Sequence, residues 1–232
     1  MKSIAIIPAR GGSKRIPRKN CKLFHEKPII AYSIEAALKS GLYDEVIVST
    51  DDNEIASIAV NYGAKVPFLR SKKNSNDFAT TVDVIFEVLD WYKNQNHFFE
   101  IATCIYACAP FVNQKLLLRA NTILKETNAD CVFPILAYSH PIQRALKIDN
   151  KGIIELFDES NPNARTQDLQ KAYHDSGMFY TFFVDRLYKT KSLRTNNTIG
   201  IEICELHAHD IDSIEDWKLA ELKYTLSLNE KF

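Results

Sequence analysis

The chain has 232 residues, with 29 Lys and Arg against 29 Asp and Glu, and 46% of its residues are hydrophobic. This length suits one large α/β domain with a core of ordinary size, and we expect residues 1–232 to form a single domain. The net charge of zero argues against a protein that coats nucleic acid or an anionic membrane, because both depend on an overall basic excess. Any anion that the chain binds must be captured by a local group of charges.

The apolar stretches and the cysteines favour a location in the cytoplasm. No apolar run approaches the roughly 18 residues of a membrane span, and the stretch from Ile4 to Ile7 is too short for a signal-peptide core. The five cysteines are odd in number and form no C-x-x-C pair, so they indicate neither a disulfide framework nor a structural zinc site. We expect reduced thiols, with Cys104 and Cys108 acting as small core residues.

Strand-like and helix-like segments alternate along the first 136 residues, which is typical of a mostly parallel sheet covered by helices. In chain order, strands are predicted at residues 3–8, 45–50, 65–69, 101–106 and 130–136. The first helix is predicted to begin at Pro28 and to end at Gly41, and the second to begin at Asp51 or Asp52 and to end near Gly63. A third helix begins at Thr80 or Thr81, and a fourth covers about residues 114–126.

After residue 137 the alternation breaks. Residues 138–171 contain Pro141, a turn at 149–152 and a polar run at 158–168, and they predict an inserted arm or hairpin. Regular signals resume with strands at 178–184 and 198–206. A last helix is predicted to begin at Ser213, where Asp216 completes a capping box.

The most informative segment is a buried strand that runs directly into a glycine-rich, basic loop, IIPARGGSKRIPRKN at residues 6–20. Gly11 and Gly12 allow backbone N–H groups to approach a ligand, and Arg10 with the lysines can donate charge-assisted hydrogen bonds to phosphate oxygens. The loop follows the first strand, at the edge where open α/β sheets bind ligands. The alternative is a solvated basic turn. The segment is neither a P-loop nor the Rossmann fingerprint, which disfavours an NAD oxidoreductase.

The segment IPARGGSKRIPRKN closely resembles the signature loop of the CMP-sugar synthetases, the cytidylyltransferases that activate nine-carbon and eight-carbon keto-acid sugars. This resemblance implies an α/β, Rossmann-like nucleotidyltransferase fold, in which helices flank a mostly parallel sheet. It also implies CTP and a keto-acid sugar as substrates, a Mg²⁺-dependent reaction, and a homodimer to which the inserted arm contributes.

The resemblance extends over nearly the whole chain. It includes Val48-Ser49-Thr50-Asp51, Leu69-Arg70, NDFATT at residues 76–81, Ala109-Pro110 and Asp210-Ile211-Asp212. The nucleotide-binding residues that it implies are Ala9, Arg10, Gly11, Gly12, Ser13, Asn20, Arg70, Asn76 and Asp77. The catalytic residues that we infer are Arg10, Lys14, Lys19 and Asp212.

Asp210 and Asp212 form a candidate metal site on grounds of spacing as well. On an extended segment two residues at i and i+2 point to the same side, and two carboxylates suit Mg²⁺, which completes its shell with water and phosphate oxygens. The alternative is that Asp212 only caps the following helix. His207 and His209 share the same spacing, but no third nitrogen or sulfur ligand lies near them, so we interpret them as ordinary strand histidines rather than a zinc site.

Departures from the sialic acid pattern indicate which sugar is used. Residues 106–110 read YACAP where many N-acetylneuraminate enzymes have QPTSP, and Gln143 stands in place of a charged contact. Together with PIQRALK at 141–147 and YHDSGMFY at 173–180, these residues most resemble the pseudaminic acid cytidylyltransferases. The sugar-contacting residues that we expect are Tyr106, Gln143, Arg144, Arg165, Gln167 and Tyr173.

The resulting hypothesis is an attack by the anomeric hydroxyl of the sugar on the α-phosphorus of CTP, which releases pyrophosphate. Arg144 or Arg165 is the candidate partner of the sugar carboxylate, and no residue stands out as a general base. N-acetylneuraminate, legionaminate and 3-deoxy-manno-octulosonate are the alternative acceptors. A catalytically silent nucleotide-binding regulatory protein is the alternative of another class.

Overall fold

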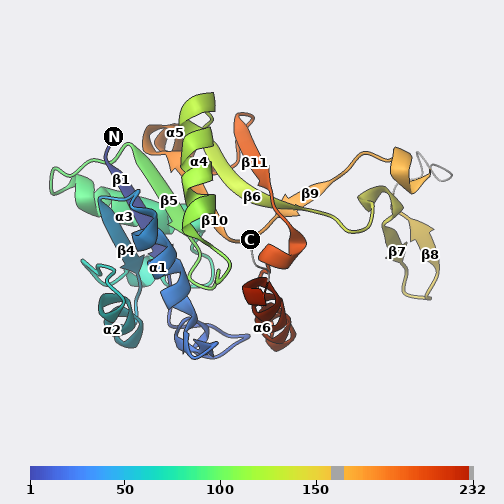
Figure 1. Ribbon diagram of the computed structural model, residues 1–232, viewed down its shortest axis with the longest axis horizontal. Helices are drawn as coiled ribbons and strands as arrows, with labels where there is room; N and C mark the ends of the chain where they lie inside the picture. The colour runs from blue at the N-terminus through green and yellow to red at the C-terminus, as the bar shows by residue number, and fades with distance from the viewer. Residues whose placement is uncertain (158–164, 230–232) are drawn as a thin grey trace.

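A mixed, mostly parallel sheet forms the centre of the molecule in a computed structural model that describes residues 1–157 and 165–229 (Figure 1). The strands are ordered β11-β6-β10-β5-β1-β4, and β9 pairs with β6. Only β10 runs against its neighbours on this path, because it pairs antiparallel with both β5 and β6. The strands of this sheet are β1 (Ser3–Pro8), β4 (Glu45–Ser49), β5 (Ile101–Ile105), β6 (Cys131–Ala137), β9 (Tyr173–Asp175), β10 (Phe179–Phe183) and β11 (Thr198–Glu202).

Helices cover both faces of this sheet, so the central strands are buried on both sides. On β1, Ala5 and Ile7 pack with α1, α4 and α6, whereas Ile4 and Ile6 pack with α3 and α5 on the other face. The helices are α1 (Ile29–Ser40), α2 (Asn53–Asn61), α3 (Thr81–Lys93), α4 (Gln114–Thr127), α5 (Val184–Thr190) and α6 (Ile214–Asn229). Within the described residues, none of these helices is long and apolar enough to span a bilayer.

Local signals place the helix ends as the sequence predicts. Gly41 ends α1 with φ 65°, in the left-handed region that favours glycine. The Asp52 side chain accepts hydrogen bonds from the first backbone N–H groups of α2, and Thr80 forms a capping box with Asp83 at the start of α3. Before α6, the Ser213 hydroxyl accepts a hydrogen bond from the Asp216 backbone N–H and the Asp216 carboxylate accepts one from the Ser213 backbone N–H, which confirms the predicted capping box.

Two predicted elements differ from the structure, and one helix was not predicted. Residues 65–69 form only two isolated bridges, from Lys65 to Ile47 of β4 and from Leu69 to Thr50 just after β4, since Pro67 lacks the N–H that a continuous ladder needs. The strand predicted at 198–206 ends at Glu202, and His207 closes a short 3-10 helix, η5 (Glu205–His207), instead of lying on a strand. Helix α5 was not predicted, because its seven residues are too few to show a helical period.

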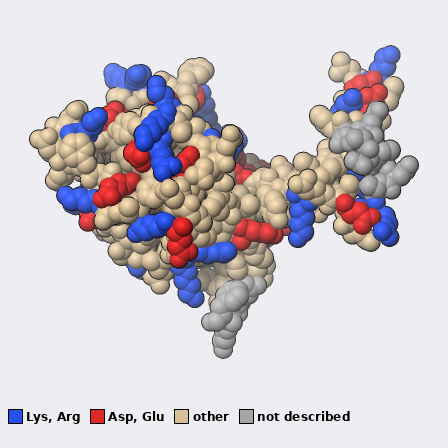
Figure 2. Space-filling model, turned by 90° about the horizontal axis from the view of Figure 1, so that it is seen from above, with Lys and Arg blue, Asp and Glu red and all other residues tan. Residues whose placement is uncertain are grey.

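Residues 138–157 and 165–172 leave the sheet between β6 and β9 and project as an arm (Figures 1 and 2). The arm carries 3-10 turns η3 (Ile142–Arg144) and η4 (Thr166–Asp168) and a hairpin of β7 (Leu146–Ile148) and β8 (Ile154–Leu156). Part of the predicted polar run, residues 158–164, lies outside the described residues.

One face of the β7–β8 hairpin is apolar. Leu146 pairs with Leu156 and Ile148 with Ile154, whereas Lys147 and Glu155 pair on the other face and form an ion pair of 3.2 Å. Leu146, Ile148 and Ile154 are 58%, 70% and 60% exposed. A two-stranded hairpin is only marginally stable by itself, so this apolar face is suited to being covered.

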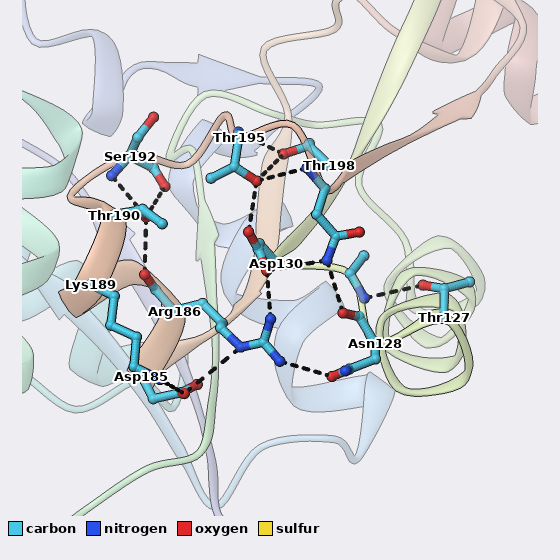
Figure 3. A network of polar contacts seen from close by, with 12 residues as sticks. Thr127, Asn128, Asp130, Asp185, Arg186, Lys189, Thr190, Ser192, Thr195 and Thr198 are labelled. Carbon is cyan, nitrogen blue, oxygen red and sulfur yellow. Dashed lines mark hydrogen bonds and ion pairs between the residues drawn. The ribbon is translucent and has the colours of Figure 1, made fainter.

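At one end of the sheet, a polar network joins four elements around Asp130 (Figure 3). The Asp130 carboxylate accepts hydrogen bonds from Arg186 of α5 at 2.8 Å and from the Thr195 hydroxyl at 2.8 Å. Arg186 also donates to the Asn128 side chain, just after α4. These contacts lower the pKa of Asp130, the hydrogen bond from Thr195 having the largest effect. The network fixes the start of β6 to α4, α5 and the entry to β11.

Two small sheet strands, β2 (Leu23–Phe24) and β3 (Lys27–Pro28), and the 3-10 turns η1 (Lys19–Cys21) and η2 (Lys72–Asn74) complete the fold. The opposite end of the sheet from Asp130 is where β1, β4 and β5 all finish, because these strands are parallel. The segments that follow them, 9–20, 50–52 and 106–108, therefore meet there. Gly177, which precedes the reversed strand β10, is brought to the same edge.

Candidate active site

A cavity of about 450 Å³ lies at the carboxyl edge of β1 and β5. The residues that line it come from the basic loop, the segment after β5, the turn before β10 and the acidic pair before α6. They are Pro8, Arg10, Ser13, Lys14, Arg15, Lys19, Asn20, Tyr106, Ala107, Cys108, Gly177, Asp210 and Asp212. The fold thus brings the predicted basic loop and the predicted acidic pair, 190 residues apart in the chain, onto one cavity.

Two cations of the loop are held by a single carboxylate from the segment before α3. Arg10 donates to Asp77 Oδ1 at 2.7 Å and Lys14 donates to Asp77 Oδ2 at 2.5 Å. Both bonds favour the charged form and lower the pKa of Asp77, the one from Lys14 most strongly. Lys14 is 76% exposed and Asp77 42% exposed, so water screens this cluster and an incoming anion can compete for its cations.

The first part of the loop is anchored to the start of α2. The Gly11 N–H donates to Asp51 at 2.9 Å, and a Cβ added at Gly11 would lie 2.7 Å from Asp52 Oδ2. A glycine is therefore needed at position 11 for the close approach to Asp52. In this conformation the Gly11 N–H already donates to a protein carboxylate, that of Asp51. Gly12, by contrast, has open space around it.

Arg18 strengthens this anchor with hydrogen bonds to Asp52 of 2.5 and 3.0 Å and an ion pair with Glu54. The Arg18 guanidinium is the largest cause of the lowered pKa of Asp52, which falls to about 2. The loop conformation is consequently fixed by charges that do not line the cavity.

A chain of hydrogen bonds joins β5 to the other side of the loop. The Cys108 thiol donates to Asn20 Oδ1 at 3.1 Å, and Asn20 Nδ2 donates to the Arg10 carbonyl at 2.9 Å. Burial raises the pKa of Cys108 to about 12, so the thiol keeps its proton near neutral pH. Ala9, at 1% exposure, continues the β1 ladder by donating to the Ser49 carbonyl.

The two acidic residues differ in their surroundings. Asp212 pairs with Arg15 at 2.9 Å and lies 3.8 Å from Lys19. Among the described residues, none donates a hydrogen bond or forms an ion pair with the Asp210 carboxylate, and its pKa is raised, first by burial and next by the Asp212 charge. Gly177, at φ 68°, lies so close that a Cβ there would be 3.1 Å from Asp210 Cγ.

This pair fits a hard cation better than a zinc ion. Two carboxylates supply oxygen ligands, and that of Asp210 receives no hydrogen bond from the described part of the chain. The part of the chain that the structure describes gathers no group of three His, Cys, Asp or Glu side chains that could hold a metal. An ion on Asp210 and Asp212 would therefore take its other ligands from water and from a bound substrate.

Two of the predicted nucleotide-binding residues, Arg70 and Asn76, direct their side-chain hydrogen bonds to other residues of the protein. Arg70 is buried, donates to the Ser49 hydroxyl at 3.0 Å and to the Ser49 carbonyl, and has a pKa lowered by burial. The Asn76 side chain closes its own turn by accepting from the Phe78 and Ala79 N–H groups, while its carbonyl accepts from Arg10. Neither residue lines the cavity.

Tyr106 is held at the wall of the cavity. Its hydroxyl lies 3.2 Å from that of Thr81, and its ring packs edge-on against Tyr180 at 5.9 Å between centroids. Behind it, Tyr180 donates to Asp175, which also accepts from Arg194 at 2.7 Å. The sequence patterns indicate no individual role for Thr81 or Gly177 at this site. For Gly177, the available signal in the sequence is a glycine that lies between a polar segment and a strand.

Of the other predicted sugar contacts, four lie on the arm and Tyr173 lies on β9, and none of them lines this cavity in the same chain. Gln143 donates to the Gln170 carbonyl, Arg165 pairs with Asp168 at 2.9 Å, and the Tyr173 hydroxyl donates to Glu202 at 3.1 Å. Arg144 and Gln167 are exposed on the arm.

Comparisons with known proteins agree on one family. A family model described as cytidylyltransferase matches residues 4–231. The chain is 39% identical, over all of both chains, to a pseudaminic acid cytidylyltransferase of Campylobacter jejuni. It is 32% identical to a CMP-N,N'-diacetyllegionaminic acid synthase of Legionella pneumophila, with 95% of each chain covered. A solved CMP:2-keto-3-deoxy-manno-octonic acid synthetase with CTP aligns at a TM-score of 0.68 and 18% identity, with 98% and 99% covered.

Proposed function

The chain belongs to the cytidylyltransferase family and is a nucleotidyltransferase, and from this premise we propose that it transfers CMP from CTP to pseudaminic acid, giving CMP-pseudaminic acid and pyrophosphate. The observation that carries the choice of sugar is the 39% identity to a relative of that name over the full length of both chains. The N,N'-diacetyllegionaminic acid synthase at 32% identity makes legionaminate the second candidate.

The reaction needs little covalent chemistry from the protein. The anomeric oxygen of the sugar forms a bond to the α-phosphorus, the bond to the β-phosphate breaks, and pyrophosphate leaves with the electron pair. Positioning and neutralisation of charge supply most of the acceleration in such a transfer. Arg10, Lys14 and Lys19 are the cations that can meet the triphosphate, and Asp77 is the carboxylate that it must displace from Arg10 and Lys14.

We propose that Asp210 and Asp212 hold Mg²⁺. The exposed pair of Arg15 with Asp212 and the lack of a donor on Asp210 within the described residues support this role. When bound there, Mg²⁺ would supply charge neutralisation for the phosphates and acidify the attacking hydroxyl. Lys19 donates to the Ile211 carbonyl at 2.6 Å, so it fixes the backbone between the two carboxylates while its charge faces the cavity.

We also propose a homodimer in which the arm of one copy reaches the other. The exposed apolar face of the hairpin favours burial against a second copy, and the arm carries Gln143, Arg144, Arg165 and Gln167 away from the cavity of its own chain. In a dimer of crossed arms, these residues would meet the partner's sugar. The prediction is a dimer mass by light scattering, reduced to that of a monomer by Ile148→Glu with Ile154→Glu.

The five free thiols support a location in the cytoplasm. Tyr106 would contact the sugar from the wall of the cavity, and Arg144 or Arg165 of the crossed arm would meet its carboxylate.

Pyrophosphate release tests the activity directly. Purified protein with CTP, Mg²⁺ and pseudaminic acid should release pyrophosphate, with a higher kcat/KM than with N-acetylneuraminate, legionaminate or 3-deoxy-manno-octulosonate. A higher value for one of the other three would refute the choice of sugar. Binding of CTP without release on any of the four would instead support a silent nucleotide-binding protein.

A further inference from the structure

A second cavity, of about 430 Å³, adjoins the first at the root of the arm. It lies between the end of β6, the strand β9, the turn η5 and the helix α6. Asp210 lines both cavities. Ser176 lines the second and its neighbour Gly177 lines the first, so the two spaces meet on either side of the same short turn.

Two buried polar atoms on the second cavity have no hydrogen-bond partner within the residues that the structure describes. Ser176 is 1% exposed, and its hydroxyl is one of them. His209 Nε2 is also buried without one, the Asp216 carboxylate being 3.8 Å away. A buried polar atom without a partner costs free energy, so two of them on one cavity point to a group that binds there.

Hydrogen bonds fix the backbone on which Ser176 stands. The Ser176 backbone N–H donates to the Pro134 carbonyl at 3.2 Å, and the preceding Asp175 is fixed by Tyr180, Arg194 and the Gly177 N–H. The side chain therefore projects from a fixed backbone position, as a binding group should.

The charges around the cavity disfavour an anion. Its one ammonium group within the described lining, Lys223, is occupied by the carbonyls of Glu205 at 2.9 Å and of Ala208 at 3.3 Å. Asp175, Glu205 and Asp210 add negative charge to the lining. Apolar surface comes from Leu136, Ala137, Ala208 and Leu219, and the other uncharged polar side chains of the lining are Tyr138, Ser139, His174, Ser176 and His209. A neutral group with one polar end and one methyl end suits these walls.

We propose that this cavity binds an acylamino substituent of the acceptor sugar. The Ser176 hydroxyl donates to the amide carbonyl, and the methyl group packs against Leu136 and Leu219. Because Asp210 lines both cavities, one sugar can have its reacting hydroxyl in the first cavity and its acylamino substituent in the second. This inference rests on the proposed function, because pseudaminic acid carries two acylamino groups.

The first test removes the hydroxyl with Ser176→Ala. Loss of one neutral hydrogen bond predicts a rise in the KM for pseudaminic acid of about threefold to tenfold, with the KM for CTP unchanged. Ser40→Ala, at the end of α1, is the matched control and should alter neither constant. An unchanged sugar KM in Ser176→Ala, or an equal rise in both KM values, would overturn the inference.

A second test asks whether the acylamino substituent is the group that Ser176 binds. The two analogues of pseudaminic acid that each lack one acyl group should be compared on the unaltered enzyme and on Ser176→Ala. For the analogue that lacks the acyl group bound by Ser176, the KM should be the same in Ser176→Ala as in the unaltered enzyme. For the other analogue, the KM should show the full rise in the variant. Equal losses with both would mean that Ser176 supports the fold or holds water only.

A third variant, Leu219→Trp, fills the cavity from an exposed position on α6. It should raise the sugar KM and spare the KM for CTP, and its melting temperature checks that it folds. If the unaltered enzyme rejects pseudaminic acid, the choice of sugar fails, and the same variants are measured with the sugar that it accepts. A sugar KM that stays unchanged in Leu219→Trp contradicts the inference.

Discussion

The two ends of the sheet use charged residues in opposite ways. At the end formed by the start of β6, the Asp130 carboxylate is 15% exposed and accepts from Arg186, Thr195 and Asn197 (Figure 3). At the carboxyl end of β1, Asp77 holds Arg10 and Lys14 in exposed ion pairs, and Asp210 has no donor among the described residues. The first cluster is saturated by its own protein, whereas the second can exchange its partners for a ligand.

Removing a carboxylate should therefore abolish activity at one end and only destabilise the protein at the other. The largest effect is expected for Asp212→Ala, which removes a proposed ligand of Mg²⁺. Turnover should fall by about 10³-fold, in the range of losing a preorganised electrostatic group, with little change in the melting temperature. Asp185→Ala, on the exposed surface of α5, is the matched control. Pyrophosphate release close to that of the unaltered enzyme would contradict the metal role.

Asp130→Asn tests the saturated end. Weakening charged hydrogen bonds to a partly buried carboxylate costs roughly 1–3 kcal/mol, which corresponds to about 2–10 °C in melting temperature for a chain of this size. The KM values and kcat should stay within about twofold at 25 °C, since the network lies away from the cavity. Scanning calorimetry and steady-state kinetics check this prediction. A variant with unaltered melting temperature would show that the network adds little.

Asp77→Asn tests the exchangeable end more finely. The side chain keeps its shape but no longer competes for Arg10 and Lys14, so the KM for CTP should fall by about twofold to threefold, the size expected for exposed ion pairs. The effect should shrink at high salt. A rise in the KM would show instead that the Asp77 charge positions the loop for catalysis.

The smallest effect concerns acid stability. The pKa of Asp52 is lowered to about 2, mainly by Arg18, so its stabilising contribution is present above the unfolded value of about 3.9 and is lost as the pH falls towards 2. Arg18→Met should shift acid unfolding to higher pH, and its loss of stability should be largest near pH 7 and shrink as the pH falls towards 2, where the pair no longer contributes. Circular dichroism between pH 5 and pH 1.5 measures the shift. Coincident acid curves would exclude the pair as a source of stability.

The helix ends and the basic loop follow from local chemistry and were predictable from the sequence, whereas the meeting of that loop with the acidic pair was implied by the family resemblance. Asp52 and Thr80 cap helices with the side chains that the sequence indicated. The reversal of β10 was not predictable, because an apolar run has no direction of its own until its neighbours are known.

The same limit applies to the neighbours of the site residues. The resemblance named Gly11 as a residue that approaches the nucleotide, yet its N–H donates to Asp51 and its missing Cβ leaves room for Asp52. Long-range contacts of this kind depend on tertiary packing, and so do the orphan hydroxyl of Ser176 and the link from Tyr106 to Thr81.

The pairing of β6 with β9 has a consequence for how such chains can diversify. Ala137 lies opposite Tyr173, and the Tyr138 N–H donates to the Ala172 carbonyl. The two ends of the arm are therefore hydrogen-bonded to each other where they leave and re-enter the sheet. Once its ends are joined, doubling the length of an insertion costs only about 0.6 kcal/mol in chain entropy. Insertions and deletions beyond these paired ends can therefore accumulate without disturbing the register that places Gly177 beside Asp210.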